Sequence, residues 1–258
     1  MTKISQAFKN DKAFIGYITG GDPNIKTTAK LIRCMAASGV DVIEIGIPFS
    51  DPIAEGPVIQ AASKRALDNG CTTDKLFDMV CEVRRDIDIP IIFMTYANPV
   101  FAYGKERFLK RCNQCGVDGL IIPDTPYEER SEFSTICYAH HVDLIDLVAP
   151  TSIERTAAIA KGSTGFLYCV SSLGVTGTRS TLSDDIKAVI DVAKSATSTP
   201  CAVGFGIATP EQAQHIVQYA DGIIVGSAIV KLVARYGEDS PRYVSEYTKT
   251  IKAAITDK

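Results

Sequence analysis

The sequence predicts an α/β protein that forms a single (β/α)8 barrel over residues 1–258, with extra N- and C-terminal helices. Three observations predict this fold. Eight short apolar runs alternate with amphipathic stretches, the alternation covers the whole chain, and no polar or Pro/Gly-rich linker interrupts it. Residues 241–258 carry apolar side chains at helical spacing, which predicts a final helix packed on the outside of the barrel.

The eight apolar runs are rich in β-branched residues and nearly continuous, as expected for parallel strands that are buried on both faces. An open doubly wound sheet is the alternative fold. It is disfavoured because no GxGxxG sequence follows the first run and because eight units are more than an open sheet usually carries. The predicted strands cover residues 13–19, 40–46, 90–96, 119–124, 142–150, 165–170, 200–206 and 222–227.

Helix boundaries can be predicted between these strands. Thr125, Thr151 and Thr209 each stand three residues before Glu or Gln, which is typical of a capped helix start. The sequence Gly-Val-Asp occurs at residues 39–41 and again at 116–118, where it indicates a helix end that leads into a strand. This recurrence favours a repeated strand–helix unit.

Charge and hydropathy exclude several classes of function. A formal net charge of −3, without a basic cluster, argues against binding to nucleic acid. The first ten residues lack the apolar stretch of a signal peptide, and no apolar run approaches the roughly 20 residues that span a bilayer. We therefore expect a cytoplasmic enzyme that acts on a small molecule, without contact to nucleic acid or membrane.

The eight cysteines predict reduced, mostly buried thiols, because no secretory signal accompanies them. Cys112 and Cys115 form a CxxC sequence, but together with Phe108 they fall on one face of a predicted helix. A metal or redox site is the alternative. It is disfavoured because no second cysteine pair or nearby histidine completes a ligand set, and no metal is expected.

Glycines gather where three consecutive predicted strands end, at residues 174–177, 204–206 and 226–227. In a barrel of this kind, the loops after the strands form the active site, and those after the last strands commonly bind phosphate. Glycine lets the backbone approach an anion closely, and a helix N-terminus adds free N–H groups. The pattern predicts a phosphate site.

Carboxylates mark the end of the second predicted strand. Glu44 lies inside an apolar strand, where burial raises the pKa of a carboxyl group toward a range useful for acid–base chemistry. A structural Glu held by backbone amides is the alternative interpretation. Asp51 and Glu55 follow in the next loop, where turn and cap roles beside proline are serious alternatives, above all for Asp51.

Seven stretches of sequence, in order and spacing, resemble the tryptophan synthase α subunit family. Any one stretch is a weak signal, but the set covers almost the whole chain. The stretches are residues 17–23, 44–60, 96–99, 123–126, 174–177, 203–207 and 225–229. The resemblance implies an eight-stranded barrel that cleaves indole-3-glycerol phosphate into indole and glyceraldehyde 3-phosphate. It also implies an α2β2 complex in which indole passes to a β subunit. That subunit carries pyridoxal phosphate, which is not expected in this chain.

The resemblance also implies roles for individual residues. Glu44 corresponds to the acid–base that protonates the indole ring and accepts the hydroxyl proton, and Glu55 to the carboxylate that holds the indole nitrogen. Tyr168 corresponds to a polar aromatic residue beside the substrate, and Thr176 to the loop that closes over the site. The remaining implied substrate-binding residues are Tyr17, Tyr96, Ile121, Leu147 and Phe205, and the implied phosphate-binding residues are Gly177, Gly206, Gly226 and Ser227.

The sequence departs from the family at Glu55, where Asp is usual. A misplacement by about one bond length can cost roughly a hundredfold in rate. Three outcomes are open: the loop retracts to compensate, the reaction is slow without the β subunit, or Asp51 takes over the role. We favour the first, because glycine and proline flank this loop, and we expect Asp51 to have an interface or structural role.

Two rival functions remain. A sugar-phosphate isomerase or aldolase of the same fold would need a lysine or an Asp pair on the inner strand ends, and the predicted strands contain no lysine. The second rival is a catalytically weak barrel that mainly activates a partner β subunit. Glu55 is the sequence feature that supports it.

Overall fold

In the computed structural model, nine parallel strands form one sheet; residues 2–9, 11–170, 179–204 and 206–256 are described. The strand order is β5-β4-β3-β2-β1-β9-β8-β7-β6, and every pairing is parallel. The strands are β1 (Ala13–Thr19), β2 (Val42–Gly46), β3 (Ile91–Met94), β4 (Gly119–Ile121), β5 (Asp143–Leu144), β6 (Leu147–Val148), β7 (Leu167–Val170), β8 (Cys201–Gly204) and β9 (Gly222–Val225).

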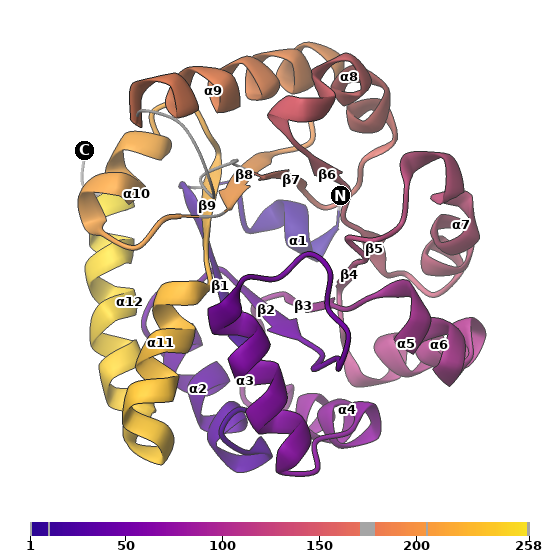
Figure 1. Ribbon diagram of the computed structural model, residues 1–258. Coiled ribbons are helices and arrows are strands. Elements are labelled where there is room, and N and C mark those ends of the chain that lie inside the picture. The colour runs from indigo at the N-terminus through magenta and orange to yellow at the C-terminus, as the bar shows by residue number, and fades with distance from the viewer. Residues whose placement is uncertain (1, 10, 171–178, 205, 257–258) are drawn as a thin grey trace.

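Helices surround this ring of strands (Figure 1). They are α1 (Lys3–Gln6), α2 (Ile25–Ala37), α3 (Pro57–Asp68), α4 (Thr73–Val83), α5 (Ala97–Tyr103), α6 (Lys105–Cys115), α7 (Ser131–Ala139), α8 (Ile153–Gly162), α9 (Arg179–Ala196), α10 (Pro210–Ile216), α11 (Ser227–Tyr236) and α12 (Ser240–Thr256). Three short 3-10 turns complete the described elements: Tyr127–Glu129, Pro150–Ser152 and Gly237–Asp239.

All eight predicted strands are present, and the fifth is divided in two. β5 pairs with β4, whereas β6 pairs with β7. Between them, the Ile145 N–H donates to the carbonyl oxygen of Leu120 at 2.9 Å, and the Asp146 carbonyl accepts from the Tyr168 N–H at 2.9 Å. The chain thus changes partner within two residues and closes the ring through its own backbone. The predicted eight-stranded barrel is confirmed.

Alternate residues of each strand point into the barrel and outward to the helices. Val42 belongs to the apolar cluster inside the barrel, whereas Ile43 and Ile45 belong to the cluster under the helices. Glu44 therefore faces the interior, because side chains alternate along a strand. The second strand thus carries one carboxyl group into the centre of an otherwise apolar ring.

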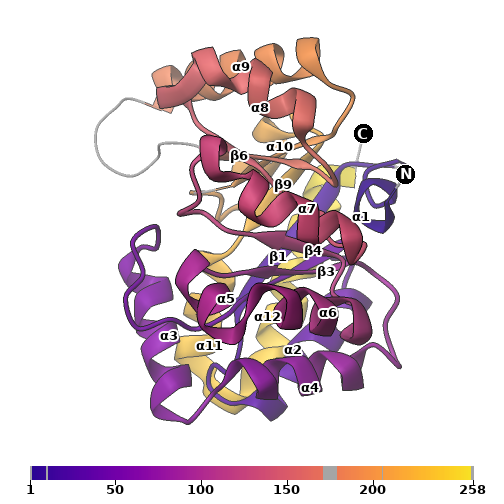
Figure 2. The same ribbon diagram turned by 90° about the vertical axis from the view of Figure 1, so that its right-hand side faces the viewer.

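The terminal helices have different places. Ile4 of α1 is fully buried within the inner cluster beside Phe166, so α1 closes one end of the barrel. Figure 2 shows α1 at that end and the segment before α3 at the opposite end. The predicted C-terminal helix is α12, which packs against α2, α10 and α11 through side chains that include Val244 and Ile251.

One of the three predicted helix caps is confirmed. Thr209 accepts from the Gln212 N–H in a full capping box at the start of α10. The prediction for Thr125 is wrong, because its buried Oγ1 has no partner among the described residues and a 3-10 turn intervenes before α7. Thr151 lies within another 3-10 turn, and α8 begins two residues later. A tighter first turn displaces the start of both helices.

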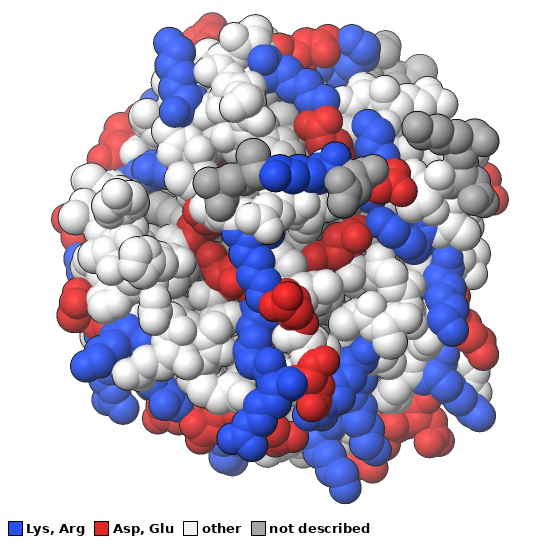
Figure 3. Space-filling model, turned by 180° about the vertical axis from the view of Figure 1, so that it is seen from behind, with Lys and Arg blue, Asp and Glu red and all other residues white. Residues whose placement is uncertain are grey.

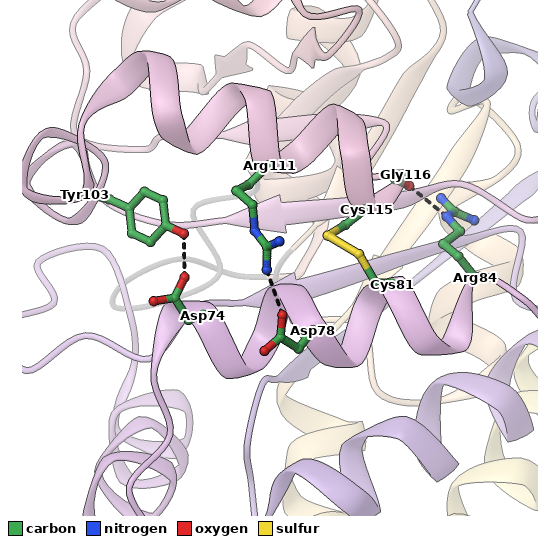
Figure 4. Close-up of a disulfide and its surroundings, with 8 residues drawn as sticks. All are labelled: Asp74, Asp78, Cys81, Arg84, Tyr103, Arg111, Cys115 and Gly116. Atoms are coloured by element: carbon green, nitrogen blue, oxygen red, sulfur yellow. Dashed lines mark hydrogen bonds and ion pairs between the residues drawn. A yellow bond between two sulfur atoms is a disulfide. The ribbon is translucent and has the colours of Figure 1, made fainter.

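One disulfide corrects the expectation that the cysteines are reduced. The helical stripe is confirmed, because Phe108, Cys112 and Cys115 are all buried on α6. Cys115, however, is bonded to Cys81 of α4, with 4.4 Å between the two Cα atoms (Figure 4). The other six cysteines are free thiols. Sequence spacing could not find this pair, because it depends on how two helices pack.

The charged residues are mixed in sign. Lys and Arg alternate with Asp and Glu across the face in Figure 3, without a broad area of one charge. Among the described residues, no helix is both long and apolar enough to cross a membrane.

Candidate active site

A cavity of about 360 Å³ lies where the strands end, at the side of the barrel opposite α1. The ends of β1, β2, β7 and β9 contribute to it, together with the starts of α3 and α11. Barrels of this kind place their active sites at the carboxyl ends of the strands. The described lining residues include Tyr17, Glu44, Glu55 and Tyr168, and also Gly206, Gly226, Ser227 and Lys231.

A second cavity, of about 670 Å³, lies near the beginnings of β4 and β5 and is lined by Asp118, Arg130 and Asp143. Arg130 is bound by both oxygens of Asp146, and Asp118 pairs with Arg84. Arg130 and Asp118 are therefore engaged in structural ion pairs, and strand beginnings in this fold serve stability rather than chemistry. The smaller cavity is therefore the candidate site.

Glu44 is the third residue of β2 and is 1 % exposed. It lies between Tyr17 of β1 and Ile92 of β3 in the strand register. Its buried Oε2 has no hydrogen-bond partner among the described residues. Burial alone raises the pKa of this carboxyl group to about 8. Glu44 can therefore hold a proton at neutral pH and give it up in a reaction, which a carboxylate bound by backbone amides could not do.

Two tyrosines stand on either side of this carboxyl group. Burial raises the pKa values of Tyr17 and Tyr168 well above the usual range, and the negative charge of Glu44 raises both further. Both phenols therefore remain neutral donors. Each hydroxyl fits against a glycine: a Cβ on Gly46 would lie 2.1 Å from the Tyr17 oxygen, and one on Gly204 would lie 2.4 Å from the Tyr168 oxygen. These two glycines provide space for the hydroxyls.

Glu55 reaches the same cavity from the loop between β2 and α3. Its Oε2 is buried without a partner among the described residues. Burial raises the pKa of Glu55, and a hydrogen bond from Tyr96 partly offsets this effect. The loop is fixed at both sides of Glu55: the Tyr96 hydroxyl accepts from the Ala54 N–H at 3.0 Å, and the Gln60 side chain donates to the Glu55 carbonyl at 2.8 Å.

Asp51 lies apart from this cavity. Its side chain is exposed and accepts a hydrogen bond from the neighbouring Ser50 hydroxyl at 2.5 Å. It therefore does not face Glu44 across the cavity, whereas Glu55 lines the cavity with it.

The glycine-rich end of the cavity faces the start of α11. This helix of 10 residues begins at Ser227, and Gly226 caps it without a side-chain hydrogen bond. The first N–H groups of α11 are therefore free to bind an anion. Gly206 has a φ of 78°, a conformation that glycine adopts without strain. Gly177, Thr176 and Phe205 lie outside the described residues.

Three residues implied by the resemblance do not line this cavity. Ile121 is packed in the inner core, Leu147 packs against that core, and Tyr96 is buried beside the Glu55 loop. Other apolar side chains take their place. They are Ile59, Met94, Ile207 and Ile224.

Lys231, which was not among the predicted site residues, is exposed and lines the cavity. It stands four residues after Ser227 in α11, so both side chains share one helix face. Helical side chains lean toward the helix N-terminus, which directs the ammonium group toward the free N–H groups. The sequence feature that could have indicated Lys231 is its spacing: the lysine follows the glycine–serine helix start by one helical turn.

Fold and site together define a class: barrel enzymes that perform acid–base chemistry with carboxyl groups on a substrate bearing an anionic group. Comparison with known proteins identifies the family. The family model described as tryptophan synthase alpha chain matches residues 4–256. The chain belongs to this family, whose members are lyases that cleave indole-3-glycerol phosphate.

Individual relatives support the assignment to this family. The tryptophan synthase alpha chain of Lacticaseibacillus casei is 47% identical over 258 residues, covering 100% of this chain and 97% of the relative. That of Lactiplantibacillus plantarum is 44% identical, covering 99% and 97%. The crystal structure of the alpha subunit from Legionella pneumophila strain Paris has a TM-score of 0.90 at 36% identity, with 99% and 98% covered. The predictions of family, fold and enzyme class are confirmed.

Proposed function

We propose that this chain cleaves indole-3-glycerol phosphate with Glu44 as the acid–base group and Glu55 as the carboxylate that binds the indole nitrogen. The observation that carries the proposal is the position of Glu44. It is a buried carboxyl group whose Oε2 has no partner among the described residues and whose pKa is raised to about 8, and it shares one cavity with Glu55. Two carboxyl groups around a flat apolar substrate meet the needs of a retro-aldol cleavage.

The proposed reaction begins with proton transfer from Glu44 to C3 of the indole ring. Positive charge then develops on the ring nitrogen, and Glu55 stabilises it by accepting a hydrogen bond from the ring N–H. The bond from C3 to the hydroxyl-bearing carbon breaks, and its electron pair returns to the ring. The hydroxyl proton passes to the Glu44 carboxylate as the aldehyde forms, so that Glu44 ends the cycle protonated. General acid–base catalysis of this type contributes about 10²–10⁴-fold.

We assign the substrate phosphate to the start of α11. The free N–H groups after Gly226 and the hydroxyl of Ser227 would bind its oxygens, and Lys231 would supply positive charge. No ion pair of Lys231 is found within the described part of the chain. The lysine therefore has its charge available for the ligand. Gly206 supports the assignment because it borders the same end of the cavity.

We further propose that the chain works with a β subunit that carries the pyridoxal phosphate, and that it needs no cofactor of its own. Solved relatives include tryptophan synthase complexes from Mycobacterium tuberculosis and Pyrococcus furiosus. A cytoplasmic location accords with this role.

A barrel that mainly activates its partner is the second candidate, and the buried carboxyl group of Glu44, with its raised pKa, favours catalysis over it. The test is indole release by the purified chain from indole-3-glycerol phosphate, alone and with a β subunit. We expect measurable release that rises on adding the β subunit. Activation of the β subunit by a chain that releases no indole would support the second candidate.

A further inference from the structure

We propose that Cys81 and Cys115 form a reversible thiol–disulfide site, oxidised by small-molecule disulfides, that covalently links α4 to α6 away from the active site. Neither cysteine lines the candidate site cavity. Disulfides are uncommon in cytosolic proteins, and those present are frequently redox-responsive. With the cytoplasmic location proposed above, the disulfide of this chain indicates a site that responds to its redox surroundings.

The two helices are positioned for this bond by non-covalent contacts. Arg111 of α6 donates to Asp78 of α4 at 2.7 Å, and the Tyr103 hydroxyl of the preceding helix α5 donates to Asp74 of α4 at 2.5 Å. Figure 4 shows both contacts in one row with the disulfide, and Arg84 on its other side.

Arg84 completes this row from the far side of the disulfide, where its Nε donates to the Gly116 carbonyl at 2.7 Å. Contacts on both sides hold α4 and α6 at bonding distance even when the sulfurs are reduced. The bond can therefore open and close without rearrangement of the helices.

The solvent exposure of the two cysteines determines which of them reacts first. Cys81 is partly exposed, whereas Cys115 is 2% exposed, so a small disulfide reaches Cys81 first. The Cys81 thiolate attacks one sulfur of the small disulfide and releases one thiol. The Cys115 thiolate then attacks the Cys81 sulfur and releases the second thiol. Two protein thiols and one small disulfide thus become one protein disulfide and two small thiols.

The remaining cysteines are poor competitors, because all of them except Cys34 are buried. This includes Cys201, which is fully buried although a hydrogen bond with Cys169 lowers its pKa. Burial raises the pKa values of Cys34 and Cys71 to about 11 and that of Cys137 to about 12. Because the thiolate is the nucleophile, these groups react slowly at neutral pH. The reaction is therefore selective for one pair.

The experiment compares the full chain after dithiothreitol with the same chain after oxidised glutathione. We expect eight free thiols in the reduced form and six in the oxidised form, with one peptide linking Cys81 to Cys115 by mass spectrometry. The bond closes a loop across 34 residues, so the melting temperature should be about 7–15 °C higher when oxidised. Indole release should differ by less than about twofold, since the site lies elsewhere.

Three variants separate this proposal from its alternatives. Cys115→Ala should abolish the difference in melting temperature between oxidised and reduced samples. Cys34→Ala, a matched control at another partly exposed cysteine, should preserve it, and so should Cys112→Ala. Eight thiols after oxidation, a Cys112–Cys115 link, or a stable glutathione adduct on Cys81 would overturn the proposal. None of these results depends on whether the chain cleaves indole-3-glycerol phosphate.

Discussion

Glu44 and Tyr17 stand directly opposite each other on β2 and β1, both nearly excluded from solvent. The Tyr17 hydroxyl lies 3.4 Å from Thr19 Oγ1, and Glu44 Oε2 has no partner within the described structure. Burial, with no partner for Oε2 among the described residues, keeps the Glu44 carboxyl group protonated at neutral pH.

Replacing Glu44 with Gln should abolish the proton transfers while preserving the shape of the side chain. We expect kcat for indole release to fall about 10²–10⁴-fold, with a much smaller change in KM. Steady-state kinetics on the purified variant would measure this, with circular dichroism to show that the fold is retained. Activity close to that of the wild type would remove Glu44 from its assigned role.

The pH dependence of stability should reveal the buried carboxyl group. The pKa of Glu44 is about 8 in the folded chain and about 4.5 when unfolded, so between these values the folded state binds one proton more. Glu44 therefore lowers the free energy of unfolding as pH rises, by about 1.4 kcal/mol per pH unit. Its effect is absent below pH 4.5 and complete above pH 8.

Urea titrations of the wild type and of Glu44→Gln would test this. The variant should gain stability relative to the wild type between pH 5 and pH 8, and the difference should become constant above that range. A difference that stays constant from pH 5 to pH 9 would show that Glu44 ionises normally in the folded chain.

Glu55→Asp should keep or raise the rate of indole release. Hydrogen bonds of Tyr96 and Gln60 hold the backbone on both sides of Glu55, so the shorter side chain should cause no loss of fold. Rates with a saturating β subunit would measure the effect, and Glu55→Gln serves as the control that removes the charge. A fall of about a hundredfold in the Asp variant would show that the loop is built for the longer side chain.

Lys231→Met should raise KM for indole-3-glycerol phosphate about tenfold and change kcat little, because the lost charge acts on the phosphate rather than on the ring. Lys231→Arg should restore most of the affinity. The dependence of kcat/KM on ionic strength should weaken in the Met variant, since the charge that attracts the anion is gone. Equal KM values for all three proteins would place Lys231 outside the phosphate site.

Much of the fold could be predicted from the pattern of the sequence. Strands buried on both faces must be continuously apolar, so eight runs were visible without any tertiary information. The division of residues 142–150 into β5 and β6 could not be predicted from the sequence, because it depends on which neighbouring strand each backbone group pairs with. The predicted helix starts at Thr125 and Thr151 are displaced because a 3-10 turn precedes each helix, which the local capping pattern does not reveal.

The sequence by itself determined the barrel and the presence of a carboxyl group at Glu44 in an apolar strand, because hydrophobic alternation and strand ends are local properties. Tertiary structure alone decided which groups share the cavity. It placed Glu55 and Lys231 in the same cavity as Glu44 and left Asp51 outside. It also joined Cys81 to Cys115, since contacts between helices distant in sequence arise from packing, which no local pattern records.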